Sequence, residues 1–312
     1  MTIISEIKDR GAVVAWSPLT DHADVIALGT KDSGGIGFDD YGGELEIYDT
    51  SITSTCEPRV LGKIKTTSRF ASLAWTATTD NDDYPMGLVA GGMIDGSVTV
   101  WDPAVICRDD NSSATTALLS TIPPTAGGGS LTALQFNPHP SHATDLATGS
   151  TNGTLSLHSL TDPTSPTAAA GTSHTLHGEV TRVAWNTQVP HILAAATSGG
   201  TVTVFDTKQS KPWCEIRAES GAPVSAMAWN PTEGLHLLTA SGDDRNPVLK
   251  LWDLRASTTV PLATLAGHEQ AVLSVCWNPH DGSLLVSCGK DNKTILWDLY
   301  SGRPVYEIPQ EE

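Results

Sequence analysis

Short stretches in which apolar residues alternate with small or polar ones recur along the whole chain. Alternation with a period of two places successive side chains on opposite faces, which is the pattern of a β-strand. Six of these stretches run into an aromatic residue, often followed by Asn-Pro or Ser-Pro, and this recurrence indicates an internal repeat. They read AVVAWSP (12–18), FASLAW (70–75), LTALQFNP (131–138), VTRVAWN (180–186), VSAMAWNP (224–231) and VLSVCWNP (272–279).

A second strand-like run follows each of these and usually ends in an aromatic residue and aspartate. Between the two runs lie a strand of small residues and a tight turn, where Asp-Gly or Asn-Gly can supply the positive φ angles of a two-residue hairpin turn. The third copy has lost both the aromatic residue and the aspartate. The six runs are LEIYD (45–49), VTVWD (98–102), LSLHS (155–159), VTVFD (202–206), LKLWD (249–253) and TILWD (294–298).

Each repeat therefore predicts four short antiparallel strands, and almost no segment has helical periodicity. Repeats of this length and composition are typical of β-propeller blades, whereas a sandwich or a jelly roll does not predict six units in register. The predicted fold class is all-β, with one propeller domain over residues 1–312. Residues 161–174 are predicted to be a loop. The predicted units span about 11–68, 69–125, 126–175, 176–220, 221–266 and 267–312.

The composition narrows the classes of partner. The formal net charge is −17 at neutral pH, from 18 basic and 35 acidic side chains. Such a surface repels phosphate backbones and anionic lipids, so the sequence predicts neither nucleic-acid binding nor direct membrane insertion. The five cysteines form no Cys-x-x-Cys pair and the N-terminus lacks a secretory pattern, which indicates reduced thiols in the cytoplasm.

No metal and no cofactor are predicted from the chemistry-bearing residues. Acidic pairs such as Asp243-Asp244 lie in separate predicted loops, without the spacing of a calcium-binding loop, and are interpreted as solvated charge. His139 and His142 are close in sequence but have no cysteine or helical histidine partner at a zinc-binding spacing. The glycine-rich stretches do not continue into the Gly-Lys-Ser/Thr of a phosphate-binding loop.

Residues 267–299 raise the question of catalysis, because they hold a histidine, serines and aspartates. The repeats resemble the WD-repeat family, which is named for its Trp-Asp strand ending. In that family a Gly-His histidine bonds an aspartate in a turn and a strand serine or threonine, and this hydroxyl bonds the strand tryptophan. The resemblance places His268, Asp291, Ser287 and Trp297 in such a structural hydrogen-bond network.

The rival interpretation of these residues is a Ser–His–Asp hydrolase site. A hydrolase needs an exposed nucleophile, an oxyanion hole and a cleft, and the chain has no G-x-S-x-G elbow. A serine hydroxyl can instead accept from an indole N–H and donate onward, so the four groups can satisfy one another. The sequence therefore predicts no catalytic residue and no enzymatic activity.

Five longer stretches resemble, more specifically, the N-terminal propeller of the large outer subunit of the COPII vesicle coat (the Sec-thirty-one type). The resemblance implies a non-catalytic scaffold at the vertices of the coat cage, in transport from the endoplasmic reticulum to the Golgi. It implies as partners a small partner propeller and further copies of itself, and as location the cytoplasmic face of endoplasmic-reticulum exit sites and COPII vesicles. The stretches are SEIKDRGAVVAWSP (5–18), AGGMIDGSVTVWDP (90–103), QVPHILAAATSGGTVTVFD (188–206), SGDDRNPVLKLWDLR (241–255) and LLVSCGKDNKTILWDLYSGRPVYEIP (284–309).

The same resemblance implies seven blades, whereas the chain supplies six complete units. Residues 2–9 read as a lone strand that would belong to an incomplete seventh blade, with an open ring as the consequence. A closed ring of six blades is the alternative.

A second function is suggested by the end of LWDLR (251–255). Its Trp-Asp-x-Arg resembles the docking motif of propellers that act as substrate receptors of cullin ubiquitin ligases, in which Arg255 would contact the adaptor. The motif is short, and an ordinary strand end with an exposed arginine is the alternative.

Overall fold

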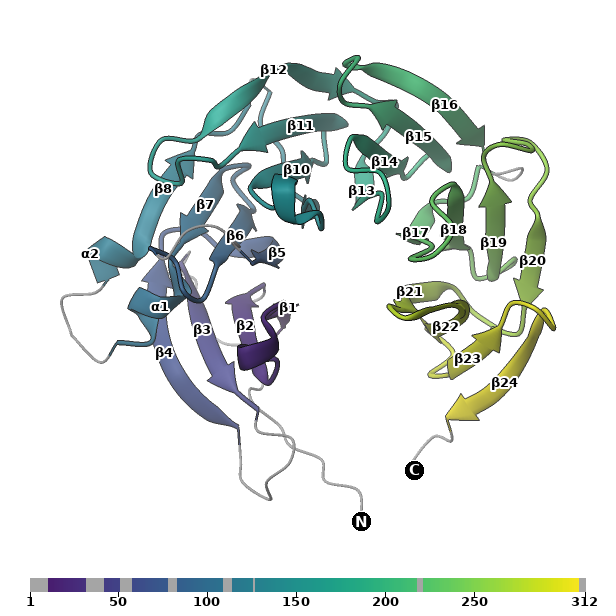
Figure 1. The fold of residues 1–312 in the computed structure, drawn as a ribbon, viewed down its shortest axis with the longest axis horizontal. Helices are drawn as coiled ribbons and strands as arrows, with labels where there is room; N and C mark the ends of the chain where they lie inside the picture. Colours follow the sequence, from purple (N-terminus) through teal and green to yellow (C-terminus); the bar gives the residue numbers. More distant parts are fainter. Residues whose placement is uncertain are drawn as a thin grey trace. The chain divides into compact units, whose positions relative to one another are not determined.

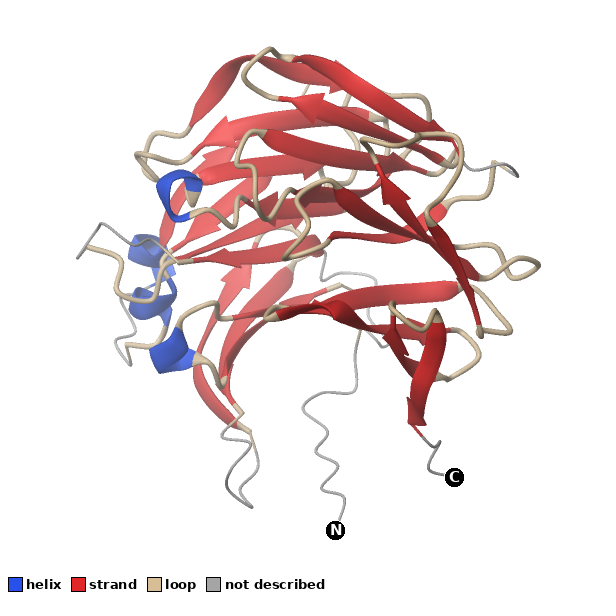
Figure 2. Ribbon diagram, turned by 45° about the vertical axis from the view of Figure 1, so that its right-hand side comes forward, coloured by secondary structure: helices blue, strands red, loops and turns tan. Residues whose placement is uncertain are grey.

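The computed structural model describes residues 11–31, 42–50, 58–77, 83–108, 114–125, 127–217 and 221–308. Strands make up nearly all of the regular structure in these residues (Figure 2). The chain divides into two compact units: unit 1 holds residues 1–152 and 156–170, and unit 2 holds residues 153–155 and 171–312.

The first three sheets each contain four antiparallel strands that are neighbours in the sheet in the order of the sequence (Figure 1). The first sheet consists of β1 (Ala12–Trp16), β2 (Val25–Thr30), β3 (Gly43–Asp49) and β4 (Arg59–Thr66). The second consists of β5 (Phe70–Thr76), β6 (Leu88–Met93), β7 (Val98–Trp101) and β8 (Leu118–Ile122). The third consists of β9 (Ala133–Phe136), β10 (Asp145–Gly149), β11 (Thr154–Ser159) and β12 (Thr167–Thr175).

The last three sheets, in unit 2, repeat this arrangement. The fourth consists of β13 (Val180–Trp185), β14 (Ile192–Thr197), β15 (Thr201–Asp206) and β16 (Lys211–Arg217). The fifth consists of β17 (Val224–Trp229), β18 (His236–Ser241), β19 (Val248–Asp253) and β20 (Ala263–Ala266). The sixth consists of β21 (Val272–Asn278), β22 (Asp281–Gly289), β23 (Thr294–Asp298) and β24 (Arg303–Ile308).

Six four-stranded antiparallel sheets confirm the predicted fold class, all-β with the blades of a WD-repeat propeller. Gly96 and Gly153 follow Asp and Asn in the tight turns and adopt positive φ angles of 86° and 84°, as predicted. The turn after β6 has three residues and not the predicted two, because the N–H of Met93 donates to the backbone oxygen of Ser97. Residues 2–9 lie outside the described residues, so the predicted closing strand stays a prediction.

Two sequence expectations need correction or addition. The loop predicted over 161–174 is wrong in its second half, where β12 begins at Thr167. Its alanines, glycine and polar residues show no alternation, but an outer strand needs backbone pairing more than apolar side chains. Four short helices were not predicted: α1 (Pro103–Ile106), α2 (Ala114–Ala117), η1 (Thr20–His22) and η2 (Pro140–His142). The carboxylate of Asp102 caps α1 by accepting from the N–H of Ala104 at 2.9 Å.

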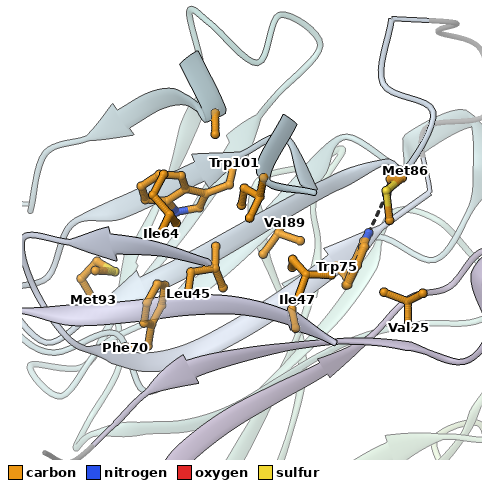
Figure 3. Close-up of a cluster of buried hydrophobic side chains, with 13 residues drawn as sticks. Val25, Leu45, Ile47, Ile64, Phe70, Trp75, Met86, Val89, Met93 and Trp101 are labelled. Carbon is orange, nitrogen blue, oxygen red and sulfur yellow. Dashed lines mark hydrogen bonds between the residues drawn. The ribbon is translucent and has the colours of Figure 1, made fainter. Parts of the chain in front are cut away.

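The buried cores lie between consecutive sheets of the same unit. In unit 1, side chains of the first sheet such as Leu45 and Ile47 pack against Phe70, Trp75 and other residues of the second sheet (Figure 3). In unit 2, one cluster joins the fourth and fifth sheets and another joins the fifth and sixth. In the second and fourth sheets the second strands, β6 and β14, lie between the first and third strands and are buried along their whole length, and they consist mainly of small or aliphatic residues.

One of the six repeat aromatics differs from the others in its burial. Trp16 on β1 is 51% exposed, whereas its five counterparts in later sheets are 3–8% exposed. Trp229 and Trp277 show why position matters, because their indole N–H groups donate to backbone oxygens of the preceding sheet, at Ala184 and Ala228. Among the described residues of unit 1 no sheet precedes β1, so Trp16 has no counterpart there of the backbone oxygens of Ala184 and Ala228.

Candidate functional site

The structure brings the four residues singled out in the sixth repeat into one hydrogen-bonded chain. Nδ1 of His268 lies 3.1 Å from both carboxylate oxygens of Asp291, and Nε2 lies 2.7 Å from the hydroxyl of Ser287. The indole N–H of Trp297 donates to that hydroxyl at 2.8 Å. We call these four residues the sixth-sheet network.

Each member comes from a different part of the sixth sheet. His268 lies between β20 and β21, Ser287 on β22, Asp291 in the turn between β22 and β23, and Trp297 on β23. Ser287 pairs with Ile295 and Trp297 with Leu285 across the two strands, and this register aims the hydroxyl at the indole. The network therefore joins the entry of the sheet to its second and third strands.

Gly289 at the end of β22 leaves the space that the histidine occupies. A Cβ atom there would collide with the Asp291 carboxylate and would lie 2.5 Å from Nδ1 of His268. Gly289→Ala is expected to lower the free energy of unfolding by about 1–3 kcal/mol, because one of the two buried side chains must move. Urea unfolding followed by tryptophan fluorescence measures this change. Ala240→Ser, a similar small change on β18, is the control and should lower the free energy of unfolding by less. An equal loss in the two variants would mean that any atom added to a second strand destabilises the chain as much as one added at Gly289.

Electrostatics favours a charged aspartate in this network. Burial acts to raise the pKa of Asp291, but the backbone N–H groups of Glu269 and Lys293 and the His268 imidazole outweigh it and hold the pKa below its usual value. A carboxylate with a lowered pKa in the folded state contributes stability above its ordinary pKa, and this stability is lost as the pH falls through the folded-state value.

The same geometry argues against hydrolysis at these residues. Ser287 is fully buried, and the side chains of His268 and Asp291 are 0% and 4% exposed. The hydroxyl oxygen already accepts from the indole of Trp297 and lies against the imidazole. A nucleophile must be reachable by substrate, so this arrangement suits packing and not acyl transfer.

The third sheet holds a feature that the sequence analysis missed. His158 on β11 occupies the position of the strand tryptophan, is 8% exposed, and its Nε2 lies 3.4 Å from the hydroxyl of Thr148. Because that hydroxyl donates to the backbone oxygen of Ser156, its lone pairs are available to an imidazole N–H. Burial lowers the pKa of His158 to about 4, so the imidazole is neutral and can replace the indole as a donor.

The hydrogen-bond partner of the tryptophan on the third strand differs between the second and fifth sheets. In the fifth sheet the indole N–H of Trp252 donates to the hydroxyl of Thr239 at 2.9 Å. In the second sheet Gly91 stands opposite Thr99, where the sixth sheet has Ser287 opposite Ile295, and the indole nitrogen of Trp101 has no partner among the described residues. The sequence analysis did not predict the pair of Trp252 and Thr239 in the fifth sheet.

Asp243 and Asp244, the acidic pair in the fifth sheet, were predicted to be solvated loop charges, but both accept hydrogen bonds from the backbone. The carboxylate of Asp244 accepts from the backbone N–H of Ala271 at 3.0 Å and lies 3.4 Å from the ammonium of Lys290. Asp243 accepts from the N–H of Arg245 within its own turn. Asp244 therefore links the fifth sheet to the start of the sixth.

Arg255, the residue of the ubiquitin-ligase alternative, has an exposed side chain at the end of β19. Its guanidinium is paired with Asp253, through Nε at 3.1 Å and a terminal nitrogen at 3.3 Å. The same carboxylate lies 3.6 Å from Nε2 of His236. Two of the donors of Arg255 are thus used inside its own sheet, which leaves fewer for an adaptor.

The described residues contain no group of three or more histidine, cysteine or acidic side chains that could hold a metal ion. Of the two histidines considered for zinc, His139 and His142, the second has its Nδ1 atom 2.9 Å from a carboxylate oxygen of Asp145. No helix within the described ranges is both long and apolar enough to cross a membrane.

Comparison with known proteins identifies the repeat and the family. A model of the WD domain, G-beta repeat, matches residues 259–298, which include the sixth-sheet network. "Protein transport protein SEC31" of Pyricularia oryzae is 40% identical over 306 residues, which is 96% of this chain and 23% of that protein. SEC31 of Dictyostelium discoideum is 33% identical over 308 residues, with 96% and 22% covered.

The chain is a homologue of the SEC31 proteins over nearly its whole length. It spans less than a quarter of the length of these relatives. A solved structure described as "COPII on membranes, outer coat vertex" matches with a TM-score of 0.75 and 26% identity, over 96% of this chain and 76% of that one. "The structure of the COPII coat assembled on membranes" matches with the same TM-score and identity, over 42% of that chain. The resemblance that the sequence indicated is thereby confirmed.

Proposed function

We propose that this chain is a non-catalytic scaffold of the COPII vesicle coat, and that it helps to form the vertices of the coat cage between the endoplasmic reticulum and the Golgi. The observation that carries the proposal is its similarity to the outer coat vertex structure over 96% of its residues. At 26% identity and a TM-score of 0.75 this similarity includes sequence as well as fold.

Other outer-coat subunits follow as partners, namely a small partner propeller and further copies of the same protein at each vertex. The corresponding location is the cytoplasmic face of endoplasmic-reticulum exit sites and of the vesicles that leave them. A surface with a net charge of −17 does not favour binding to anionic lipid on its own. Contacts that are individually weak become strong when many copies assemble, so such a scaffold needs no tight pairwise interface.

The physical chemistry of the sheets supports a structural role without catalysis. The residues that most resemble a catalytic triad are buried and hydrogen-bonded to one another. Their arrangement stabilises a rigid sheet, and rigid sheets present loops in fixed positions for contacts with partners.

Removing residues 11–308 from the full-length protein is expected to abolish closed cages in coat assembly on vesicles, because the vertices would lack this body. Electron tomography of coats assembled from purified subunits measures the outcome. A variant in which an unrelated propeller replaces these residues controls for the loss of bulk. Regular cages with normal vertices in the deletion variant would overturn the proposal.

A further inference from the structure

A groove of about 550 Å³ lies within unit 2, along the outer strand of the fourth sheet. Its volume falls in the range of roughly 300–1,000 Å³ that is typical of ligand pockets. Residues 175–177, which begin at the end of β12, form one wall, and the consecutive residues Pro212–Glu215 of β16 form another. Because neighbouring side chains of a strand point to opposite faces, a groove that contacts all four of these residues runs along the edge of β16.

The edge of β16 is free to pair with an extended peptide. β16 is the last strand in the order of the fourth sheet, and no strand of the described ranges pairs with its other side. Lys211 and Pro212 discourage pairing at the start of β16, which leaves the part from Cys214 to Arg217 open. Addition of a strand to such an edge gives affinity through main-chain hydrogen bonds, and pockets for alternate side chains give specificity.

The sixth sheet shows why this groove is open in the fourth. Its Lys293 pairs with Glu269 at 2.8 Å and with Glu307 at 3.5 Å, and these ion pairs bridge the corresponding place. The register of the two sheets puts Thr201 where the sixth sheet has Lys293. The side chain of threonine is too short to reach across, and the groove is therefore left open.

Thr203 contributes a buried hydroxyl group to the lining. The residue is 6% exposed, and its hydroxyl forms no hydrogen bond with any described residue. The hydroxyl of Thr197, by contrast, donates to the backbone oxygen of Thr201 at 3.3 Å. Because a hydroxyl can both donate and accept, that of Thr203 can pair with a hydroxyl group of a ligand. A buried polar group gains from such a partner.

The charged groups of the lining favour a neutral ligand. Glu215 and Arg217 are the acidic and basic residues that line the groove in the described ranges, histidine apart, and they neutralise each other. The guanidinium of Arg217 donates to the carboxylate of Glu215 from Nε at 3.0 Å and from a terminal nitrogen at 2.8 Å. Burial raises the pKa of Cys214 to about 11, so this thiol is neutral as well. Trp213, which is 47% exposed, and Leu176 supply apolar surface.

We propose that this groove binds an extended segment of a partner protein that carries a tyrosine, with the segment paired along the edge of β16. The tyrosine ring would pack against Trp213, and its hydroxyl would hydrogen-bond with that of Thr203. Phenylalanine would leave Thr203 unsatisfied, and a charged side chain would face both members of the pair of Glu215 and Arg217. The inference does not depend on the proposed coat function, because it rests on the lining of the groove.

The test is a titration of the chain with the peptide acetyl-Thr-Val-Tyr-Val-Thr-amide, followed through the indole N–H resonance of Trp213, which Trp213→Phe assigns. A dissociation constant in the millimolar range is expected for so short a probe. The analogue with phenylalanine in place of tyrosine should bind about three- to tenfold more weakly, because it lacks one hydrogen bond. Equal binding of the two peptides, or no shift of the Trp213 resonance at several millimolar, would overturn the proposal.

Thr203→Val tests the hydroxyl contact, because valine keeps the shape of threonine. The variant should bind the tyrosine peptide only as well as the phenylalanine peptide, and its binding of the phenylalanine peptide should stay within twofold of the wild type. Since the hydroxyl of Thr203 has no partner in the described part of the chain, thermal melting should show no loss of stability. Equal weakening of both peptides by Thr203→Val would contradict the contact.

Trp213→Ala tests the aromatic surface, and binding is then followed through the aromatic resonances of the peptides. This variant should weaken both peptides at least tenfold. Tyr300→Ala, which removes an exposed aromatic side chain between β23 and β24, is the matched control and should leave both within twofold. The same weakening by the two variants would show non-specific contact with exposed aromatic residues and would contradict a site at Trp213.

Discussion

Replacing His268 with alanine is expected to lower the free energy of unfolding by about 3 kcal/mol, because two buried groups, the Asp291 carboxylate and the Ser287 hydroxyl, each lose a hydrogen-bond partner at a cost of about 1–3 kcal/mol. The side chains of His268 and Asp291 are 0% and 4% exposed, so water cannot readily replace the lost partner. The Ser287 hydroxyl also loses its contact with Nε2 of the imidazole, at 2.7 Å. Urea unfolding of the wild type and the variant at neutral pH measures the change through the midpoint and the slope.

A double-mutant cycle with Ser287→Ala separates a coupled network from independent contacts. The loss in the double variant should be smaller than the sum of the two single losses, because both substitutions break the same contact. His177→Ala, at an exposed position in the entry to the fourth sheet, is the matched control and should change stability by no more than about 0.5 kcal/mol. A His268→Ala variant as stable as this control would mean that the network contributes nothing to the fold.

The sixth-sheet network could be predicted from the sequence because the repeat resembles the WD-repeat family, in which each member of such a network has a place in a local pattern. A Gly-His pair precedes the first strand, a serine lies on the second, an aspartate in the turn and a tryptophan on the third. Strand register then brings Ser287 and Trp297 together, and the alternation of apolar residues indicates that register without any knowledge of long-range packing. The six four-stranded sheets could be predicted for the same reason.

Other features depend on neighbours that a repeat pattern does not encode. Trp16 has the same motif as Trp229, yet one is half exposed and the other is 3% exposed. Asp244 looked like a solvated loop charge because its acceptor contact with Ala271 reaches into the next repeat.

The sheets therefore share the same four-stranded antiparallel arrangement but differ in the polar groups that lie beside the third strand. One sheet has a full network, one has the Trp252–Thr239 pair, one has an imidazole donor, and one leaves the indole of Trp101 without a partner in the described part of the chain. A buried polar group without a partner costs free energy, so these sheets should differ in local stability. The third sheet, in which burial lowers the pKa of His158, should begin to lose stability at a higher pH than the sixth sheet, in which the pKa of Asp291 is lowered.

His158→Gln is expected to remove a loss of stability that the wild type shows as the pH falls from about 6.5 to about 4. Burial lowers the pKa of His158 from 6.5 to about 4, so the unfolded chain binds a proton that the folded chain excludes between these values. The contribution of the neutral His158 to the free energy of unfolding is complete above pH 6.5, decreases as the pH falls, and no longer changes below the folded-state pKa. A shift of this size corresponds to about 3 kcal/mol. Urea unfolding at a series of pH values measures the slope in the wild type and in the variant.

Glutamine suits this test because its amide can still donate to the hydroxyl of Thr148 but does not titrate. The difference between wild type and His158→Gln therefore isolates the proton from the hydrogen bond. His177→Gln, in an exposed position, should keep the slope of the wild type. If His158→Gln kept the full slope of the free energy of unfolding against pH, another group would be responsible for the loss of stability in acid. Protonation of His158 would then not destabilise the folded chain.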